Sequence, residues 1–219
     1  MASSTKISKL ERVADALGIN RRFHTPKQDN INMDSHVVVS PVQATVASYG
    51  PIRRDGLIII KSREITPSEV LGYRHKLFLG GQYINLYLRP TDKHYWRTPY
   101  DGEFVYTKCS NGEAVIPIFI GLERILKTEL FSKAIKKNAS IASILQTKSF
   151  PIGMIAVGSL NVNSIHTVYN ENQHYDKGEH CGYFSIGSSM LILFPKNTVK
   201  TLVKLGNKVD IGEPVVEIV

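Results

Sequence analysis

Short runs of β-branched and aromatic residues recur along most of this sequence, and each run is bounded by glycine, proline, aspartate or asparagine. Such runs are typical of β-strands separated by turns. They lie at Val37–Val39, Leu57–Ile60, Tyr83–Leu88, Glu103–Tyr106, Val115–Ile120, Ile152–Val157, Leu160–Val168, Tyr183–Ile186, Met190–Phe194 and Val215–Val219. The pattern predicts a mainly β fold of the α+β class, with a β-sandwich or barrel-sandwich core of short antiparallel strands and a few helices.

The N-terminal part of the chain has a different pattern. Lys6–Gly18 places apolar residues at helical spacing among basic residues, which predicts an amphipathic helix. Such a helix either packs on its own domain or lies on a membrane surface or a partner. The polar stretch His24–Asp34 follows as an arm. We therefore expect residues 1–34 to form a helix and arm, and residues 35–219 to form the main domain.

Two later segments also have a distinct character. Gly121–Gln146 contains apolar residues at spacings that suit one or two helices. Val203–Ile218 combines two glycine turns with alternating apolar residues, which predicts a hairpin that closes a small β-sandwich.

The charge balance indicates an anionic partner. The chain has 27 basic and 19 acidic residues, for a net charge of +8, which favours nucleic acid, an acidic lipid head group or a phosphorylated metabolite. No P-loop or dinucleotide fingerprint is present, so we do not expect a nucleotide-binding α/β enzyme. Aromatic residues do not alternate with the basic clusters as they do in a single-strand-binding face. We therefore expect a small-molecule or lipid-head-group substrate rather than nucleic acid.

The sequence also predicts a cytoplasmic location. Its apolar runs are too short to span a membrane, and its first residues do not form a secretory signal. Cys109 and Cys181 are too few for a disulfide framework. His166, His174 and His180 match no common zinc spacing, so we expect no metal site.

The segment Lys177–Ser189 contains the strongest chemical signal. Within it, Gly187–Ser188 places a hydroxyl directly after a flexible peptide carbonyl. A serine so placed can attack that carbonyl to form an ester, and β-elimination followed by hydrolysis then leaves a pyruvoyl group. The pyruvoyl ketone reacts with substrate amines and acts as an electron sink for decarboxylation. Taken alone, the same residues also suit a simple turn between two core strands.

The segment resembles the cleavage region of the phosphatidylserine decarboxylase family, in which a lysine- and glycine-containing lead-in precedes Gly-Ser-Thr or Gly-Ser-Ser. Three other stretches occur in the family's order. Ser40–Ala44 resembles its Pro-x-Asp-Gly strand, and Leu88–Gly102 resembles its Asp-x-His-x-x-His-x-Pro segment. Ile155–Ile165 resembles its Val-Gly-Ala-x-x-Val-Gly-Ser-Ile strand pair. The resemblance covers most of residues 40–219.

This resemblance implies an enzyme, namely a carbon–carbon lyase of the decarboxylase type with the fold of that family. Its cofactor would be a pyruvoyl group derived from Ser188, formed by cleavage after Gly187. Its substrate would be a phospholipid or an amino-acid-derived molecule, which implies peripheral contact with a membrane. The resemblance also implies a homodimer.

The triad that drives self-cleavage in the family is altered here. In the family, an aspartate orients a histidine, and the histidine removes the proton of the cleavage-site serine. Ser188 fits the serine, but Gln43 stands at the aspartate position and Arg97 stands at the histidine position. Arginine cannot accept a proton at neutral pH, and glutamine has no charge. His94 is retained and resembles the family's residue near the decarboxylation centre.

Three interpretations remain open. Another base could drive maturation, with His180, His166 or Glu179 as candidates. Alternatively, Ser188 could stay uncleaved, in a binding protein or scaffold that has no cofactor. The uncleaved pocket could also catalyse a different reaction, in which Arg97 would bind a carboxylate or phosphate.

The candidate site residues are the same in each interpretation. The catalytic candidates are Ser188, His94, Arg97 and Gln43, and the substrate-binding candidates are Arg97, Trp96 and Ser189.

Overall fold

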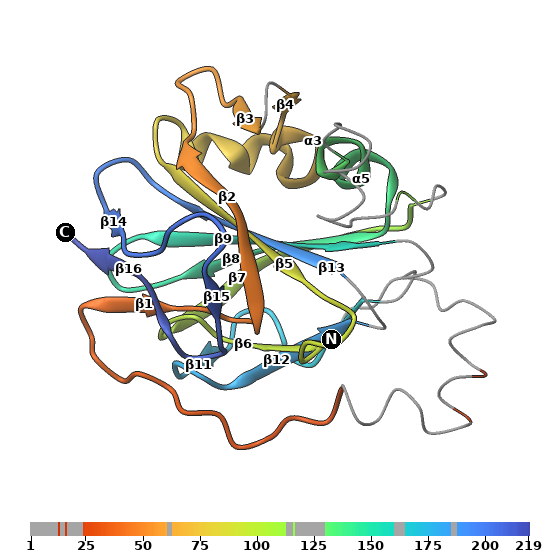
Figure 1. The fold of residues 1–219 in the computed structure, drawn as a ribbon. Coiled ribbons are helices and arrows are strands. Elements are labelled where there is room, and N and C mark those ends of the chain that lie inside the picture. Colours follow the sequence, from red (N-terminus) through yellow and green to blue (C-terminus); the bar gives the residue numbers. More distant parts are fainter. Residues whose placement is uncertain are drawn as a thin grey trace.

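The computed structural model describes residues 13, 16, 24–60, 63–112, 116, 130–159, 165–184 and 188–219. Most of the described residues lie in antiparallel β-strands, so the predicted mainly β class is confirmed (Figure 1). The predicted helix over Lys6–Gly18 lies outside the described residues except for Val13 and Ala16, as does the predicted strand Val115–Ile120 except for Ile116. No helix in the described part of the chain is long and apolar enough to cross a membrane.

The largest sheet, here called the central sheet, has eight strands in the order β11-β7-β8-β9-β13-β5-β2-β15. In that order the strands are His174–Tyr175, Gly102–Ser110, Ser140–Gln146, Pro151–Gly158, Ser188–Phe194, Gln82–Leu88, Ala44–Pro51 and Lys208–Val209. Every residue of β13 is buried. Both faces of this strand are covered, which explains why Met190–Phe194 is continuously apolar rather than alternating.

Two smaller sheets cover one face of the central sheet. The outer sheet consists of β10 (Ile165–Thr167), β12 (His180–Phe184) and β6 (Tyr95–Arg97). The terminal sheet consists of β1 (Val37–Val39), β16 (Pro214–Ile218) and β14 (Val199–Thr201). The main hydrophobic core lies between these sheets and the central sheet, and it includes Met190, Ile192, Trp96, Phe184 and Val216.

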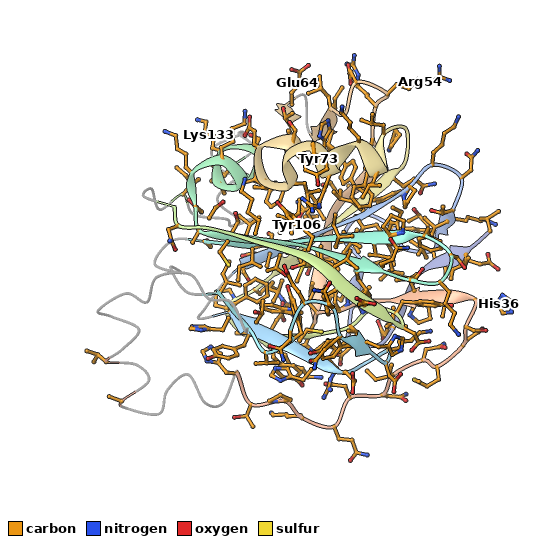
Figure 2. All side chains as sticks on the ribbon, turned by 180° about the vertical axis from the view of Figure 1, so that it is seen from behind. His36, Arg54, Glu64, Tyr73, Tyr106 and Lys133 are labelled. Carbon is orange, nitrogen blue, oxygen red and sulfur yellow. The ribbon has the colours of Figure 1, made fainter. Side chains whose placement is uncertain are left out.

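A helical layer covers the other face of the central sheet. It contains α3 (Ser68–Leu71), the 3-10 helix η1 (Gly72–Phe78), α5 (Phe131–Lys137) and the hairpin of β3 (Ile58–Ile60) and β4 (Arg63–Ile65). Figure 2 shows Tyr106 on the sheet beneath this layer and Tyr73 within it, and the Arg74 guanidinium lies 4.0 Å from the centre of the Tyr106 ring. A second core, which includes Leu191, fills the space between the layers.

The structure corrects the prediction that Gly121–Gln146 is only helical. Its described C-terminal part contains α5, but Ser140–Gln146 forms β8 in the middle of the central sheet. All residues of β8 except Gln146 are buried. A strand that is buried on both faces loses the alternation of polar and apolar residues, so its sequence cannot be distinguished from that of a buried helix.

The predicted hairpin over Val203–Ile218 is also wrong. β15 pairs with β2 of the central sheet, whereas β16 pairs with β1 and β14 of the terminal sheet. Between them, Gly212 has a φ of 89° and lies against the arm, where a Cβ atom would be 2.5 Å from the Asn30 carbonyl oxygen. The turn therefore carries the chain from one sheet to another, and the local pattern of residues does not reveal this change of partner.

Candidate functional site

Ser188 is the first residue of β13 and lies in the middle of the central sheet. It is opposite Leu88 of β5 on one side and opposite Gly158 of β9 on the other. Its side chain is fully buried, and its Oγ atom has no hydrogen-bond partner among the described residues. Gly187, on the other side of the predicted cleavage point, lies outside the described residues. A buried hydroxyl without a partner is destabilising, so Ser188 needs an explanation other than packing.

The strands beside Ser188 and the strands of the outer sheet follow a matching order. The order β9-β13-β5 in the central sheet matches the order β10-β12-β6 in the outer sheet, and each strand leads to its counterpart along the chain. At the end of β12, the backbone N–H of Phe184 donates to the carbonyl of His94 at 2.7 Å. Leu88 and Gly158, the partners of Ser188, are the last residues of β5 and β9, and Phe184 is the last residue of β12. We call these residues (Leu88, His94, Gly158, Phe184 and Ser188) the corner.

The side chains of Ser188 and Ser189 point to opposite faces of the central sheet, because side chains alternate along a strand. Ser188 lies on the face of Met190, which belongs to the main core, and Ser189 lies on the face of Leu191, which belongs to the second core. The structure therefore does not bring Ser189 into the surroundings of the Ser188 hydroxyl. A substrate contact by Ser189 stays a prediction.

Gly158 is held by a buried asparagine that sequence reasoning missed as a site residue. The side-chain amide of Asn138 donates to the Gly158 carbonyl at 2.7 Å, and the N–H of Gly158 donates to the carbonyl of Ala139 at 2.9 Å. Both polar groups of Gly158 therefore point away from β13. The pair of Gly158 with Ser188 is then the non-hydrogen-bonded kind, in which opposite Cα atoms lie only about 4.5 Å apart. Gly158 also presents no side chain toward the Ser188 side chain.

His94 is the buried imidazole of the corner. Burial is the main reason why its pKa falls from 6.5 to about 4, and the positive charge of His24 lowers it further. A hydrogen bond with the backbone of Asp92 acts in the opposite direction but is the weaker influence. His94 is therefore neutral at neutral pH, and a neutral imidazole can accept a proton.

Arg97 binds other parts of the protein with all of its guanidinium nitrogens. Nε donates to the Asp29 carboxylate at 2.7 Å, Nη1 to the Gly178 carbonyl at 2.8 Å and Nη2 to the Lys27 carbonyl at 2.6 Å. The guanidinium that was predicted to bind a substrate anion is thus paired with a carboxylate of this same chain. Its binding of a substrate stays a prediction.

Gln43 belongs to the same network of contacts. Its Oε1 atom accepts the backbone N–H of Lys93 at 2.9 Å, and its Nε2 atom donates to Asp210 at 3.3 Å. The Lys93 ammonium lies 2.7 Å from Asp29 and 3.1 Å from Asp210. The two altered triad positions are therefore joined in one polar network, here called the clasp (Asp29, Gln43, Lys93, Arg97 and Asp210). Sequence reasoning missed Asp29 and Lys93, which carry no local motif.

Trp96 lies in the main core and not on an open surface. Its side chain is 3% exposed, and its ring centre is 4.6 Å from that of Phe184. A Cβ atom at Gly182 would be 2.4 Å from the Trp96 ring, so Trp96 fills the space that this glycine leaves. The structure therefore supports the core-packing role of Trp96, and its contact with a substrate stays a prediction.

The alternative bases lie at different ends of β12. His166 stacks on Tyr183, beside the corner, with ring centres 4.6 Å apart. Glu179 and His180 lie at the opposite end, where the Glu179 carboxylate accepts the backbone N–H of Asp176 at 3.0 Å. The His180 Nε2 atom is 3.1 Å from the Gly182 carbonyl oxygen. Only His166 of these three therefore lies at the corner end of the strand. Within the described ranges, no three His, Cys, Asp or Glu residues are arranged to hold a metal ion.

Comparison with known proteins identifies the family of this chain. The family model described as phosphatidylserine decarboxylase matches residues 19–217. The phosphatidylserine decarboxylase proenzyme of Halalkalibacterium halodurans is 28% identical over 82% of this chain and 70% of its own length. Those of Geobacillus sp. and Anoxybacillus flavithermus are 28% and 34% identical over 78% and 75% of this chain, and over 64% and 61% of their own lengths. Because the family model spans almost the whole sequence, this chain belongs to the phosphatidylserine decarboxylase family, as its motifs predicted.

Proposed function

We propose that this chain is a lyase that decarboxylates phosphatidylserine or a related amino-acid-derived substrate, and that it matures by cleaving its own backbone before Ser188. Family membership supports decarboxylase chemistry and favours it over an uncleaved binding protein or scaffold. The observation that carries the proposal is the Ser188 hydroxyl, which is buried and has no partner among the described residues. Packing alone would favour an apolar side chain at this place, because an unpaired hydroxyl costs free energy.

The surroundings of Ser188 fit the pyruvoyl group that the family implies. Cleavage would leave residue 188 at the start of β13, where the strands that contain Leu88 and Gly158 would keep the new chain end in the sheet. Gly158, opposite residue 188 on β9, has no side chain. The pyruvoyl group supplies an electron sink for the loss of carbon dioxide from a substrate amine.

We assign the proton transfer during cleavage to His94, because its backbone binds Phe184 at the end of the strand that leads to Ser188, because it is neutral at pH 7, and because Arg97 cannot accept a proton. The Ser188 hydroxyl oxygen adds to the carbonyl carbon of residue 187 while His94 accepts the hydroxyl proton. The proton passes to the peptide nitrogen as the C–N bond breaks, which leaves an ester. Removal of the Ser188 Cα proton then breaks the ester C–O bond, releasing a carboxylate on residue 187 and leaving dehydroalanine. Water hydrolyses the imine form of dehydroalanine to the ketone and releases ammonia.

An anionic substrate is consistent with the net charge of +8. Because Arg97 is paired with Asp29, a substrate anion would reach this guanidinium only by displacing that carboxylate. Peripheral contact with a membrane, a cytoplasmic location and a homodimer stay predictions. Sedimentation with phosphatidylserine vesicles would test the first of these.

Intact mass spectrometry of the purified full chain tests the proposal. We expect two fragments, residues 1–187 and residues 188–219, and we expect borohydride to reduce the ketone of the second fragment. Ser188→Ala should abolish cleavage, whereas the matched control Ser189→Ala should retain it, because that side chain points to the opposite face of the sheet. A single wild-type species of 24.5 kDa would refute self-cleavage. Cleaved protein that releases no carbon dioxide from phosphatidylserine vesicles or free amino acids would refute the decarboxylase assignment.

A further inference from the structure

The arm, His24–Asp34, is attached to the outer face of the outer sheet. Figure 1 shows it passing beneath β11 and β12, on the side away from the main core. The N–H of Lys27 donates to the Tyr95 hydroxyl at 3.1 Å, and the N–H of Asn32 donates to the Gly212 carbonyl at 3.1 Å. Most side chains of the arm are exposed, so its attachment depends on a few contacts.

Asp29 is the most buried of these attachments. Its side chain is 1% exposed, and its carboxylate accepts hydrogen bonds from Lys93 and Arg97, each at 2.7 Å, and from the Tyr95 hydroxyl at 2.9 Å. A carboxylate is buried this deeply only when charged partners and hydrogen bonds compensate for the loss of water. The cation that replaces the family's histidine at position 97 is thus one of the groups that hold the arm.

The other end of the arm lies at the corner. The His24 ring stacks on Tyr183 at 4.9 Å between ring centres, and Tyr183 precedes Phe184, whose N–H donates to the His94 carbonyl. The charge of His24 also lowers the pKa of His94, although burial is the main cause of that shift. The arm therefore connects the clasp to Tyr183, the neighbour of the Phe184 residue that binds the His94 backbone.

We propose that Asp29 is a positioning residue: with Lys93 and Arg97 it fixes the arm across the outer sheet, and so holds His24 against Tyr183 at the corner that contains His94 and Ser188. In this proposal, Arg97 does not transfer a proton, as the family's histidine does at this position. It helps instead to attach the arm. The effect on catalysis rests on the proposed cleavage before Ser188, whereas the attachment of the arm to the corner does not.

Hydrogen exchange of the full chain tests the attachment without requiring cleavage. In Asp29→Asn, we expect the hydrogen-bonded amides of Lys27 and Asn32 to exchange roughly tenfold faster, relative to those of β8, because the clasp no longer holds the arm. The amide of Phe184 should also exchange faster. Asp34→Asn, the same change at an exposed residue of the arm, should alter neither. Unchanged exchange in the arm, or a released arm with unchanged exchange at Phe184, would overturn the inference.

The rate of cleavage tests the effect on chemistry. We expect Asp29→Asn and His24→Gln to slow cleavage by roughly tenfold or more through misplacement of the site, and we expect His36→Gln to leave it unchanged, because His36 points away from the domain (Figure 2). The pKa of His94 is lowered mainly by burial and further by the charge of His24, and it is raised by the backbone hydrogen bond and the charge of Asp92, so removing His24 should shift the acid limb of the rate to higher pH. If the wild type is not cleaved, the proposed function fails and hydrogen exchange decides the inference. If both variants are cleaved at the wild-type rate, the inference alone fails.

Discussion

The clasp makes a quantitative prediction about stability. Asp29→Asn removes the carboxylate that neutralises Lys93 and Arg97, whose side chains are 25% and 16% exposed. Breaking a buried ion pair from one side typically costs about 3–5 kcal/mol. Because both cations keep some contact with water, we expect a smaller loss, of about 2–3 kcal/mol. For a chain of this size, that loss corresponds to a decrease in Tm of roughly 5–10 °C.

Urea unfolding of the uncleavable Ser188→Ala chain measures this loss without interference from processing. A double-mutant cycle with Arg97→Met then isolates the pair, and we expect the two changes together to cost less than the sum of the single changes. Asp34→Asn provides the exposed control and should alter the free energy of unfolding by less than about 0.5 kcal/mol. If Asp29→Asn is as mild as this control, the carboxylate is solvated and the reasoning about the clasp is refuted.

The pH dependence gives a second measure of the same interaction. Burial alone would raise the pKa of Asp29, but the hydrogen bonds and charges of its partners outweigh it and hold the pKa below 3.8. Since the folded pKa lies below the unfolded one, the stabilisation is present above pH 3.8 and is lost as the pH falls through the folded value. Asp29→Asn should lack this loss at acidic pH.

Two further predictions concern the corner. Asn138→Ala should cost about 2–3 kcal/mol in urea unfolding and should slow cleavage, because it leaves the Gly158 carbonyl and the backbone of Ile116 without their buried partner. Wild-type stability with normal cleavage would show that Gly158 needs no such support. The pKa of His94 is about 4 in the folded chain and 6.5 in the unfolded chain. The free energy of unfolding should therefore decrease by roughly 3 kcal/mol as the pH falls from 6.5 to about 4, because the unfolded chain binds the proton first. His94→Gln should abolish that part of the pH profile, and an unchanged profile would contradict the burial of His94.

Much of the fold could be predicted from the sequence because the strands are short and bounded by turn residues. The strands at Val37–Val39 and Met190–Phe194 were predicted at or near their observed positions. Prediction failed at β8, where burial on both faces removes the alternating pattern, and at β15 and β16, whose partners lie far away in the chain.

The residues of the candidate site could also be predicted from the sequence only in part. Ser188 was recognisable because cleavage needs a particular short run of residues, and the family's motifs keep their order along the chain. The roles of Arg97 and Gln43 were not recognisable, because their partners are distant: Asp29 is 68 residues before Arg97, and Asp210 is 167 residues after Gln43.

The sequence by itself determined the family, the mainly β class and the residue at which cleavage is expected. These properties follow from local residue preferences and from short motifs, which need no knowledge of long-range contacts. Only the tertiary structure decided that Asp29 neutralises Arg97, that Asn138 holds Gly158 and that Ser188 and Ser189 face different cores. Each of these depends on which distant segments are packed together, because buried charges and polar groups need partners that the neighbouring sequence does not supply.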